Sequence, residues 1–206
     1  MNEKFFDLKK EKQDRMINAA LKIFAQQGYK HASTDDIVKE ASISKGLLFH
    51  YFGSKLGTYT FVYDYSVRYM ILEMKRCVQK DQTDLFELLK QQETAKLQAM
   101  KGYPYMQQFL NRCMIEDVSE ALLAVEDKKR SLAEFCQEIL GQVDVSLLPE
   151  GVDGEKIWTM LELTIQGLLA RHSLEADFHV SELQEEIFGY VDMVKKMVYG
   201  KVNQEE

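Results

Sequence analysis

The residues best suited to bind a large ligand are clustered between Ser44 and Lys55, in the stretch Ser-Lys-Gly-Leu-Leu-Phe-His-Tyr-Phe-Gly-Ser-Lys. Its hydroxyl, ammonium, imidazole and phenol groups can donate hydrogen bonds to phosphate oxygens and to the edges of bases. Ser44 can cap a helix, and the exposed N–H groups of a helix N-terminus attract phosphate. Gly46 has no side chain, so the backbone can come close to DNA. The chemistry that this stretch predicts is DNA binding.

A helix that begins after Ser44 would divide its side chains between two faces. Leu48 and Phe52 lie one turn apart and are expected to face the interior, and Phe49 is also interpreted as core rather than contact. The other face then carries the groups that could reach base edges or phosphates, namely Lys45, Leu47, His50 and Tyr51.

Each of these residues also has a plainer explanation. Lys55 alone would be an ordinary solvated lysine, and His50 could simply be exposed. The interpretation depends on the whole set, and Lys45 and Tyr51 are its strongest members.

Two earlier helical segments would position this stretch. A first helix is indicated by apolar residues at helical spacing up to Phe24, with Gly28 as its stop. Ser33 and Thr34 can cap a second, short helix that continues to Ala41. The residues between Ala41 and Ser44 are too few for anything but a tight turn. Two short helices joined in this way form the helix-turn-helix pattern.

The remainder of the chain also predicts helices only. Pro occurs only at positions 104 and 149, and no strand-like alternation bounded by turns is found. Ser54 can cap a fourth helix that runs to about Lys80. Later helices are expected over residues 84–100, 104–117, 119–140, 154–174 and 180–199, with Pro104 in a first helical position.

The charge of the chain is unevenly distributed. The net charge is −7, but residues 1–55 hold 10 Lys and Arg against 7 Asp and Glu, whereas residues 56–206 hold 16 against 26. A basic head on an acidic body is typical of a protein whose small module meets phosphates. The N-terminal stretch lacks the apolar core of a secretion signal, and no stretch is apolar enough to span a membrane. The three cysteines, Cys77, Cys113 and Cys136, are widely spaced, which favours a reducing, cytoplasmic location.

Residues 15–55 resemble the DNA-binding module of the TetR family of bacterial transcriptional regulators. The matching positions, in the family's order and spacing, are Ala20, Phe24, Gly28-Tyr29, Thr34, Ile37, Ala41, Ser44-Lys45-Gly46, Leu48, Tyr51-Phe52 and Lys55. The resemblance implies a repressor that binds a palindromic double-stranded DNA operator as a homodimer and is released by a small-molecule effector. It also implies that phosphates are held by Ser33, Thr34, Ser44 and Lys55, that Lys45, Gly46, Leu47 and His50 face the groove, and that Tyr51 touches backbone or base.

Two positions depart from the family's pattern. Phe49 stands where the family usually has a tyrosine, so that hydroxyl cannot bind a phosphate here. Ser42 replaces a common turn glycine, which puts a modest strain on the turn if a left-handed conformation is needed.

The last two predicted helices carry more apolar residues than one buried stripe requires. We predict that they pack against their counterparts in a second subunit, as an isologous four-helix interface. The alternative is that they are interior helices of a monomer. The predicted interface residues are Ile157, Trp158, Leu161, Ile165, Leu168, Ile187, Val191, Val194 and Val198.

The middle helices are rich in methionine and aromatic residues, which suit an apolar pocket for a small apolar or amphipathic effector. Plain core packing is the commoner explanation for any one of them. Net acidity favours, weakly, a cationic effector. The predicted pocket residues are Phe61, Tyr65, Met70, Met74, Phe86, Met100, Tyr103, Met106, Phe109 and Met114.

Enzyme motifs and cofactor-binding motifs are not found, including metal-binding His-Glu pairs, a phosphate-cradling glycine loop and an elbow serine. His172 and His179 flank Glu175, but a solvated helix end explains them better than a metal site. A helical architectural or cell-division DNA-binding protein without effector control is the remaining alternative. The predicted fold class is all-α, with a three-helix helix-turn-helix DNA-binding domain over residues 1–55 and a larger helical ligand-binding and dimerisation domain over residues 56–206.

Overall fold

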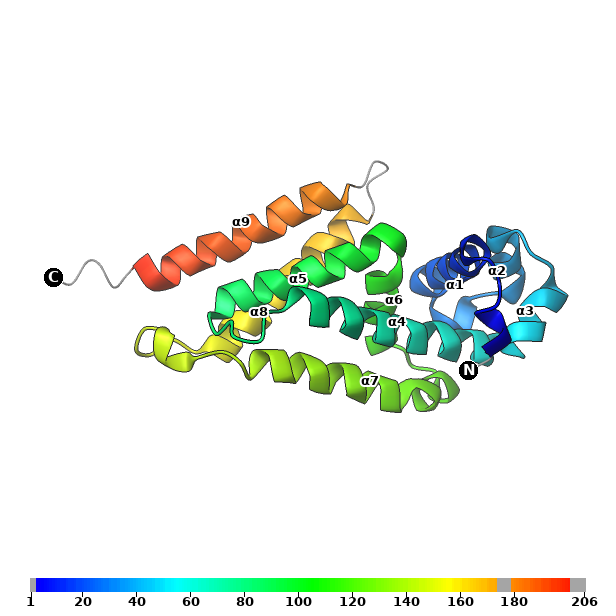
Figure 1. Ribbon diagram of the computed structural model, residues 1–206, viewed down its shortest axis with the longest axis horizontal. Helices are drawn as coiled ribbons and strands as arrows, with labels where there is room; N and C mark the ends of the chain where they lie inside the picture. Colours follow the sequence, from blue (N-terminus) through cyan, green and yellow to red (C-terminus); the bar gives the residue numbers. More distant parts are fainter. Residues whose placement is uncertain (1–2, 174–178, 201–206) are drawn as a thin grey trace. The chain divides into compact units, whose positions relative to one another are not determined.

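A computed structural model describes residues 3–173 and 179–200, and within these ranges the chain forms helices and no strand (Figure 1). This confirms the all-α prediction. The elements are η1 (Glu3–Phe5), α1 (Lys10–His31), α2 (Thr34–Ala41), α3 (Lys45–Phe52), α4 (Lys55–Cys77), α5 (Leu85–Gly102), α6 (Met106–Met114), α7 (Ser119–Leu140), η2 (Val145–Leu147), α8 (Gly154–His172) and α9 (Val180–Tyr199).

One predicted helix start is wrong. Pro104 does not begin α6, because the N–H of Met106 donates to the Tyr103 carbonyl oxygen at 3.0 Å and closes a turn across the proline. Tyr105 is the N-cap residue, so the helix begins only at Met106. The proline therefore shapes the connection between α5 and α6 rather than the first turn of α6.

The chain folds as two compact units. The first comprises residues up to Ile71 together with Ala99–Ala133, and the second comprises Leu72–Gln98 and the residues from Glu134 onward. The expected division into a DNA-binding part ending at residue 55 and a larger part after it is a functional one, and it stays a prediction.

Aromatic packing holds the first unit together. The ring of Phe24 in α1 lies 5.1 Å from that of Tyr59 in α4 and 6.1 Å from that of Phe109 in α6, and the rings of Tyr59 and Phe109 are 5.5 Å apart. All three side chains are buried. Aromatic pairs at such distances add about 0.5–1.5 kcal/mol each to the burial of their area. This cluster therefore fixes α1 against α4 and α6.

A break in α1 brings the end of that helix to the connection between α6 and α7. Gly28 has φ 69° and ψ 173°, which is not helical. The next residue, Tyr29, donates its backbone N–H to Glu116 Oε2 at 2.9 Å and its hydroxyl to Glu120 Oε1 at 2.7 Å. Burial, together with the Glu120 carboxylate, raises the pKa of Tyr29 to about 12, so the phenol keeps its proton and remains a donor.

The second unit contains most of α5 together with α8 and α9, and α9 contacts α8 (Figure 1). Lys195 of α9 reaches Glu87 at 2.8 Å and Asp84 at 3.2 Å, and the Tyr199 hydroxyl donates to Asp84 at 3.1 Å. These polar bonds fasten α9 to the start of α5. Within the described ranges, no helix combines the length and apolar character that crossing a membrane requires.

We expect Gly28→Ala to lower the free energy of unfolding by about 1–3 kcal/mol, because its backbone lies in a region that only glycine adopts readily. An added Cβ would also lie 3.0 Å from the Arg112 guanidinium. Urea denaturation measures the effect. Gly102→Ala is the matched control, since a Cβ there meets nothing within 4 Å. Equal stability of the two variants would contradict this account of the α1 break.

Candidate nucleic-acid interface

The turn between α2 and α3 has the capping bonds that the sequence predicts. Ser33 Oγ accepts a hydrogen bond from the Asp35 N–H at 3.1 Å, and Ser44 Oγ accepts one from the Leu47 N–H at 3.2 Å. Ser42 adopts the left-handed conformation, with φ 51° and ψ 52°. The helix-turn-helix is therefore present, and its turn places a serine in a conformation that favours glycine.

The exposed face of α3 carries most of the predicted contact residues. Lys45, Gly46 and His50 are exposed, and Leu47 and Tyr51 are half-buried. No atom lies within 4 Å of a Cβ built on Gly46, so the backbone is open to a close approach. These positions can meet one ligand surface together.

Lys45 already has an ionic partner in the protein. Its ammonium lies 2.8 Å from the carboxylate of Asp35, and both side chains are largely exposed. Exposed ion pairs contribute about 0–1 kcal/mol, so a phosphate or a base edge can replace Asp35 at little cost. The pair links the start of α3 to the first turn of α2.

The inner face of α3 corrects one expectation. Leu48 is fully buried as predicted, but Phe49 is 37% exposed, so its interpretation as a core residue is wrong. Phe49 follows Lys45 by four positions, which places both on the outward side of the helix. The aromatic ring thus extends the outer surface of α3.

The predicted phosphate-binding residues flank this face. Thr34 begins α2, and Ser33 and Ser44 keep their own hydroxyl hydrogens, which can be donated to phosphate oxygens. Lys55 donates to the Lys30 carbonyl oxygen at 3.3 Å, and its ammonium lies 4.7 Å from the ring centre of Tyr29. Lys55 is therefore held at the end of α1 rather than freely solvated.

A buried N-terminal phenylalanine supports the recognition helix, and sequence reasoning missed it. Phe5 is fully buried, with its ring 5.3 Å from Phe52, 5.7 Å from Tyr51 and 4.8 Å from Phe61. Gln13 donates to the backbone oxygens of the segment just before α1, at 3.0 and 2.7 Å. The signal in the sequence was a pair of adjacent phenylalanines in an otherwise polar stretch.

We expect Phe5→Ala to lower the free energy of unfolding by about 3 kcal/mol, as for a phenylalanine removed from a core. Phe6→Ala is the matched control, because Phe6 is 42% exposed and its loss should cost about 1 kcal/mol or less. Urea denaturation of the two variants decides the point. Similar losses for both would mean that Phe5 does not anchor the segment.

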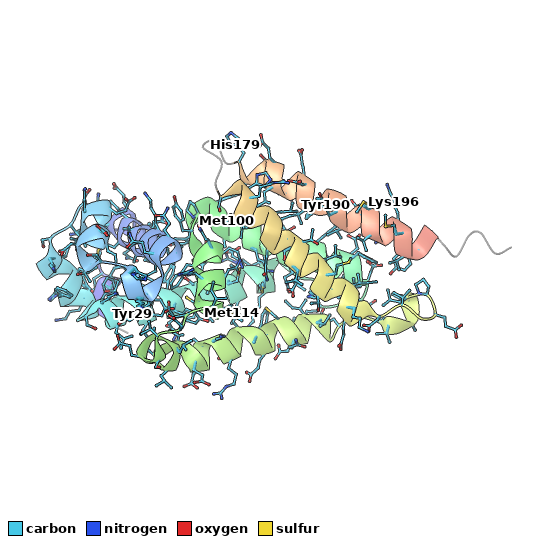
Figure 2. The ribbon with its side chains drawn as sticks, turned by 180° about the vertical axis from the view of Figure 1, so that it is seen from behind. Tyr29, Met100, Met114, His179, Tyr190 and Lys196 are labelled. Atoms are coloured by element: carbon cyan, nitrogen blue, oxygen red, sulfur yellow. The ribbon has the colours of Figure 1, made fainter. Side chains whose placement is uncertain are left out.

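The residues predicted to line an effector pocket are mostly packed in the core, and the structure divides them. Met74 and Phe86 lie in the second unit and the others in the first. Met114, at the end of α6, is 61% exposed, so its place in an apolar pocket is not supported (Figure 2). Met74 lines a hollow of about 600 Å³ with Val78, Phe135 and Ile139. Phe61 lines a different groove, of about 610 Å³.

The residues predicted for the dimer interface are largely covered by their own chain. The six that are buried are Trp158, Leu161, Ile165, Leu168, Ile187 and Val191, while Ile157, Val194 and Val198 are half-buried. A different apolar set is exposed on the same two helices. It comprises Met160, Leu163, Tyr190, Met193 and Met197, with Tyr190 on α9 visible in Figure 2.

The sequence suggested that His172 lies at a solvated helix end, and the structure contradicts this. His172 is buried, and its Nε2 lies 2.8 Å from Glu186 Oε2, with Arg171 on the same carboxylate. Arg171 and His172 hold the pKa of the Glu186 carboxyl below its ordinary value. Glu175 lies outside the described residues. Among the residues that are described, no three His, Cys, Asp or Glu side chains gather as metal ligands would.

Comparison with known proteins agrees with this geometry. Residues 16–57 match the family model described as bacterial regulatory proteins, tetR family. The uncharacterized HTH-type transcriptional regulator YuxN of Bacillus subtilis (strain 168) is 31% identical over 153 residues, which are 64% of this chain and 52% of YuxN. The HTH-type transcriptional regulator HbdR of Aromatoleum sp. (strain CIB) is 42% identical over 48 residues, which are 23% of this chain and 21% of HbdR. The matched part thus spans about half of YuxN and less of HbdR.

Solved structures share the fold over nearly the whole chain. A TetR family transcriptional regulator from Chloroflexus aurantiacus J-10-FL has a TM-score of 0.66 and 20% identity, covering 95% of this chain and 94% of its own. The transcriptional regulator FadR from Bacillus subtilis, crystallised in complex with stearoyl-CoA, has a TM-score of 0.57 and 16% identity, covering 86% and 96%.

Proposed function

This chain carries the DNA-binding module of the tetR family of bacterial regulatory proteins and has the fold of TetR-family regulators, and we propose that it is a transcriptional repressor. In this proposal it binds a palindromic operator as a homodimer and leaves it when a small molecule binds. The observation that carries the proposal is the outward face of α3, with Lys45, Gly46 and His50 exposed after a capped turn.

Three kinds of contact follow from that face. The N-terminal N–H groups of α2 and α3 and the capping serines would hold phosphates. Lys45 and His50 would reach base edges in the major groove, where donors and acceptors distinguish the bases. Tyr51 would contact the backbone or a base, with its ring supported by Phe5. The phosphate contacts would therefore fix the position of α3, and its side chains would contact the bases in the major groove.

Selecting binding sites from random DNA tests the proposal, with a palindromic consensus as the expected result. On the selected site, Lys45→Ala and Tyr51→Ala should each weaken binding by about 1–3 kcal/mol, as for lost base contacts. Fluorescence anisotropy measures the affinity across a salt series, in which wild-type binding should weaken steeply as salt rises.

The control for this series is Lys80→Ala, which removes an exposed lysine that follows α4. Its affinity should equal that of the wild type. A failure to enrich any site would contradict DNA binding, and binding that neither Lys45→Ala nor Tyr51→Ala weakens would contradict the role of α3.

Dimerisation is proposed through the exposed apolar residues of α8 and α9. Leu163 is 63% exposed and Met197 59% exposed, although each lies on a helix that also carries buried apolar residues. An apolar face of this kind is typical of an interaction site. A second copy would cover it through the same face, since a two-fold interface is self-complementary. Two recognition helices about 34–36 Å apart would then match successive half-sites.

We expect Leu163→Glu to shift the protein to a 24.0 kDa monomer, because a carboxylate would be buried in the proposed contact. Light scattering at micromolar concentration measures the mass. Leu123→Glu is the matched control, since Leu123 is also an exposed leucine, 73% exposed, on α7. A wild-type mass of one chain, or a dimer that survives Leu163→Glu, would refute this interface.

Effector control has a physical route within the first unit. Tyr103, at the connection between α5 and α6, donates its hydroxyl to Asp14 of α1 at 2.6 Å and bonds the Tyr65 hydroxyl of α4 at 2.6 Å. Displacement of this connection would move α1 and the module that it carries. A regulator with the same fold binds stearoyl-CoA, which supports a small-molecule effector. An architectural DNA-binding protein on this scaffold would instead keep its affinity whatever ligand is added.

A further inference from the structure

The second unit contains a partly buried polar cluster that the apolar pocket hypothesis does not use. It consists of Gln92, Glu93 and Lys96 on α5 and Glu162 on α8. Gln92 is fully buried and Glu93 is 2% exposed, whereas Lys96 and Glu162 are half-buried. Burying such groups costs free energy unless each finds a partner, so a cluster of this kind requires an explanation.

The bonds within the cluster leave one acceptor unsatisfied. Lys96 Nζ lies 2.6 Å from Glu93 Oε1, and Gln92 Nε2 donates to Glu162 Oε1 at 3.3 Å. The other end of the same carboxamide, Gln92 Oε1, is buried and has no hydrogen-bond partner. If the Gln92 amide were turned over, its Oε1 would face Glu162 Oε1, and two acceptors cannot form a hydrogen bond. The reverse orientation therefore also leaves a polar atom without a partner. The site needs a donor from outside the cluster.

The charges of the cluster identify the kind of donor. Two carboxylates face one ammonium, which leaves an excess of one negative charge. Burial alone would lower the pKa of Lys96, but Glu93 and Glu162 raise it, so the lysine stays charged. A positively charged donor would satisfy Gln92 and balance the second carboxylate in one step.

The surroundings favour an organic cation over a metal ion. Leu89 precedes Gln92 by three positions, and Trp158 and Ile165 lie one turn from Glu162; all three are buried. Such apolar side chains suit the hydrocarbon frame of an organic cation. Among the described residues there is no group of three His, Cys, Asp or Glu that a metal would need.

We infer that Gln92, Glu93 and Glu162 form the polar end of the effector site, and that the effector is a protonated organic amine that keeps at least one N–H. This inference rests on the proposed function, because it names the ligand class of the proposed regulator. The N–H donates to Gln92 Oε1, and the positive charge lies beside Glu162. An acyl carboxylate or a coenzyme A ester would instead bring negative charge to a site that already has an excess of it.

Calorimetry and thermal unfolding of the full chain test the inference with three probes that share one hydrocarbon chain. Hexylamine carries an N–H and a positive charge, hexyltrimethylammonium carries the charge alone, and hexanoate carries a negative charge. Hexylamine should bind and raise the unfolding temperature. The other two should bind about tenfold more weakly or not at all, because the lost charge-assisted hydrogen bond is worth about 1.5–3 kcal/mol.

Variants locate the site. Glu162→Gln should weaken hexylamine binding about tenfold or more, whereas Glu126→Gln, at an exposed carboxylate of α7, should leave it unchanged. Gln92→Met removes the unsatisfied acceptor and should give the same loss, which provides a second measurement if Glu162→Gln does not fold.

Three results would overturn the inference. They are no binding of hexylamine, equal binding of hexylamine and hexyltrimethylammonium, and binding that both Glu162→Gln and Gln92→Met leave intact. DNA affinity measured without amine separates this inference from the proposed function. A chain that binds its operator and ignores amines overturns only the ligand class, whereas a chain that binds amines but no DNA overturns only the regulator.

Discussion

A recognition helix of eight residues cannot hold its own position. Isolated helices of this length are unstable in water, so the conformation of α3 depends on what its inner face buries. Leu48 supplies the fully buried anchor, and the rings of Phe52 and Tyr51 pack on Phe5 from the N-terminal segment. Phe61 of α4 closes the same cluster. The outer face of α3 can remain open only because these contacts fix the helix from behind.

The position of the helix-turn-helix module in turn depends on the contacts of α1. The helix α1 carries this module, and its two ends meet different parts of the first unit. Near its start, Asp14 accepts the Tyr103 hydroxyl, and beyond its break Tyr29 binds Glu116 and Glu120. Both contacts are polar and directional, so they tolerate less displacement than apolar packing does. The position of the module is thus tied at two points to the segments that connect α5, α6 and α7.

Sequence patterns predicted the parts of this arrangement that local chemistry determines. The bounds of α7 and α9, and the caps at Ser33 and Ser44, follow from spacing and from side chains that bond their own backbone. The helix-turn-helix follows from the same signals, and with it the exposed positions of Lys45 and His50. The left-handed conformation of Ser42 was expected only because the related family usually has a glycine at this position.

Features that depend on distant partners could not be predicted in this way. Periodicity showed that Phe49 and Trp158 are apolar residues on helices, but not which neighbour covers each one. Phe49 proved exposed and Trp158 buried within its own chain, because burial is decided by helices far away in the sequence. Phe5 was missed for the same reason, since the rings of α3 and α4 that it contacts lie more than forty residues later.

Buried polar groups are the hardest case, because nothing in a local pattern distinguishes Glu93 from a solvated glutamate. Alternation of charged and apolar residues on α5 is what an ordinary surface helix shows. Only the fold brings Glu93 into the interior and places the Gln92 amide against Glu162 of α8. A protein gains little stability from such a cluster compared with a well-packed apolar one. The net negative charge and the unsatisfied oxygen therefore agree better with a ligand that arrives than with a core that is already complete.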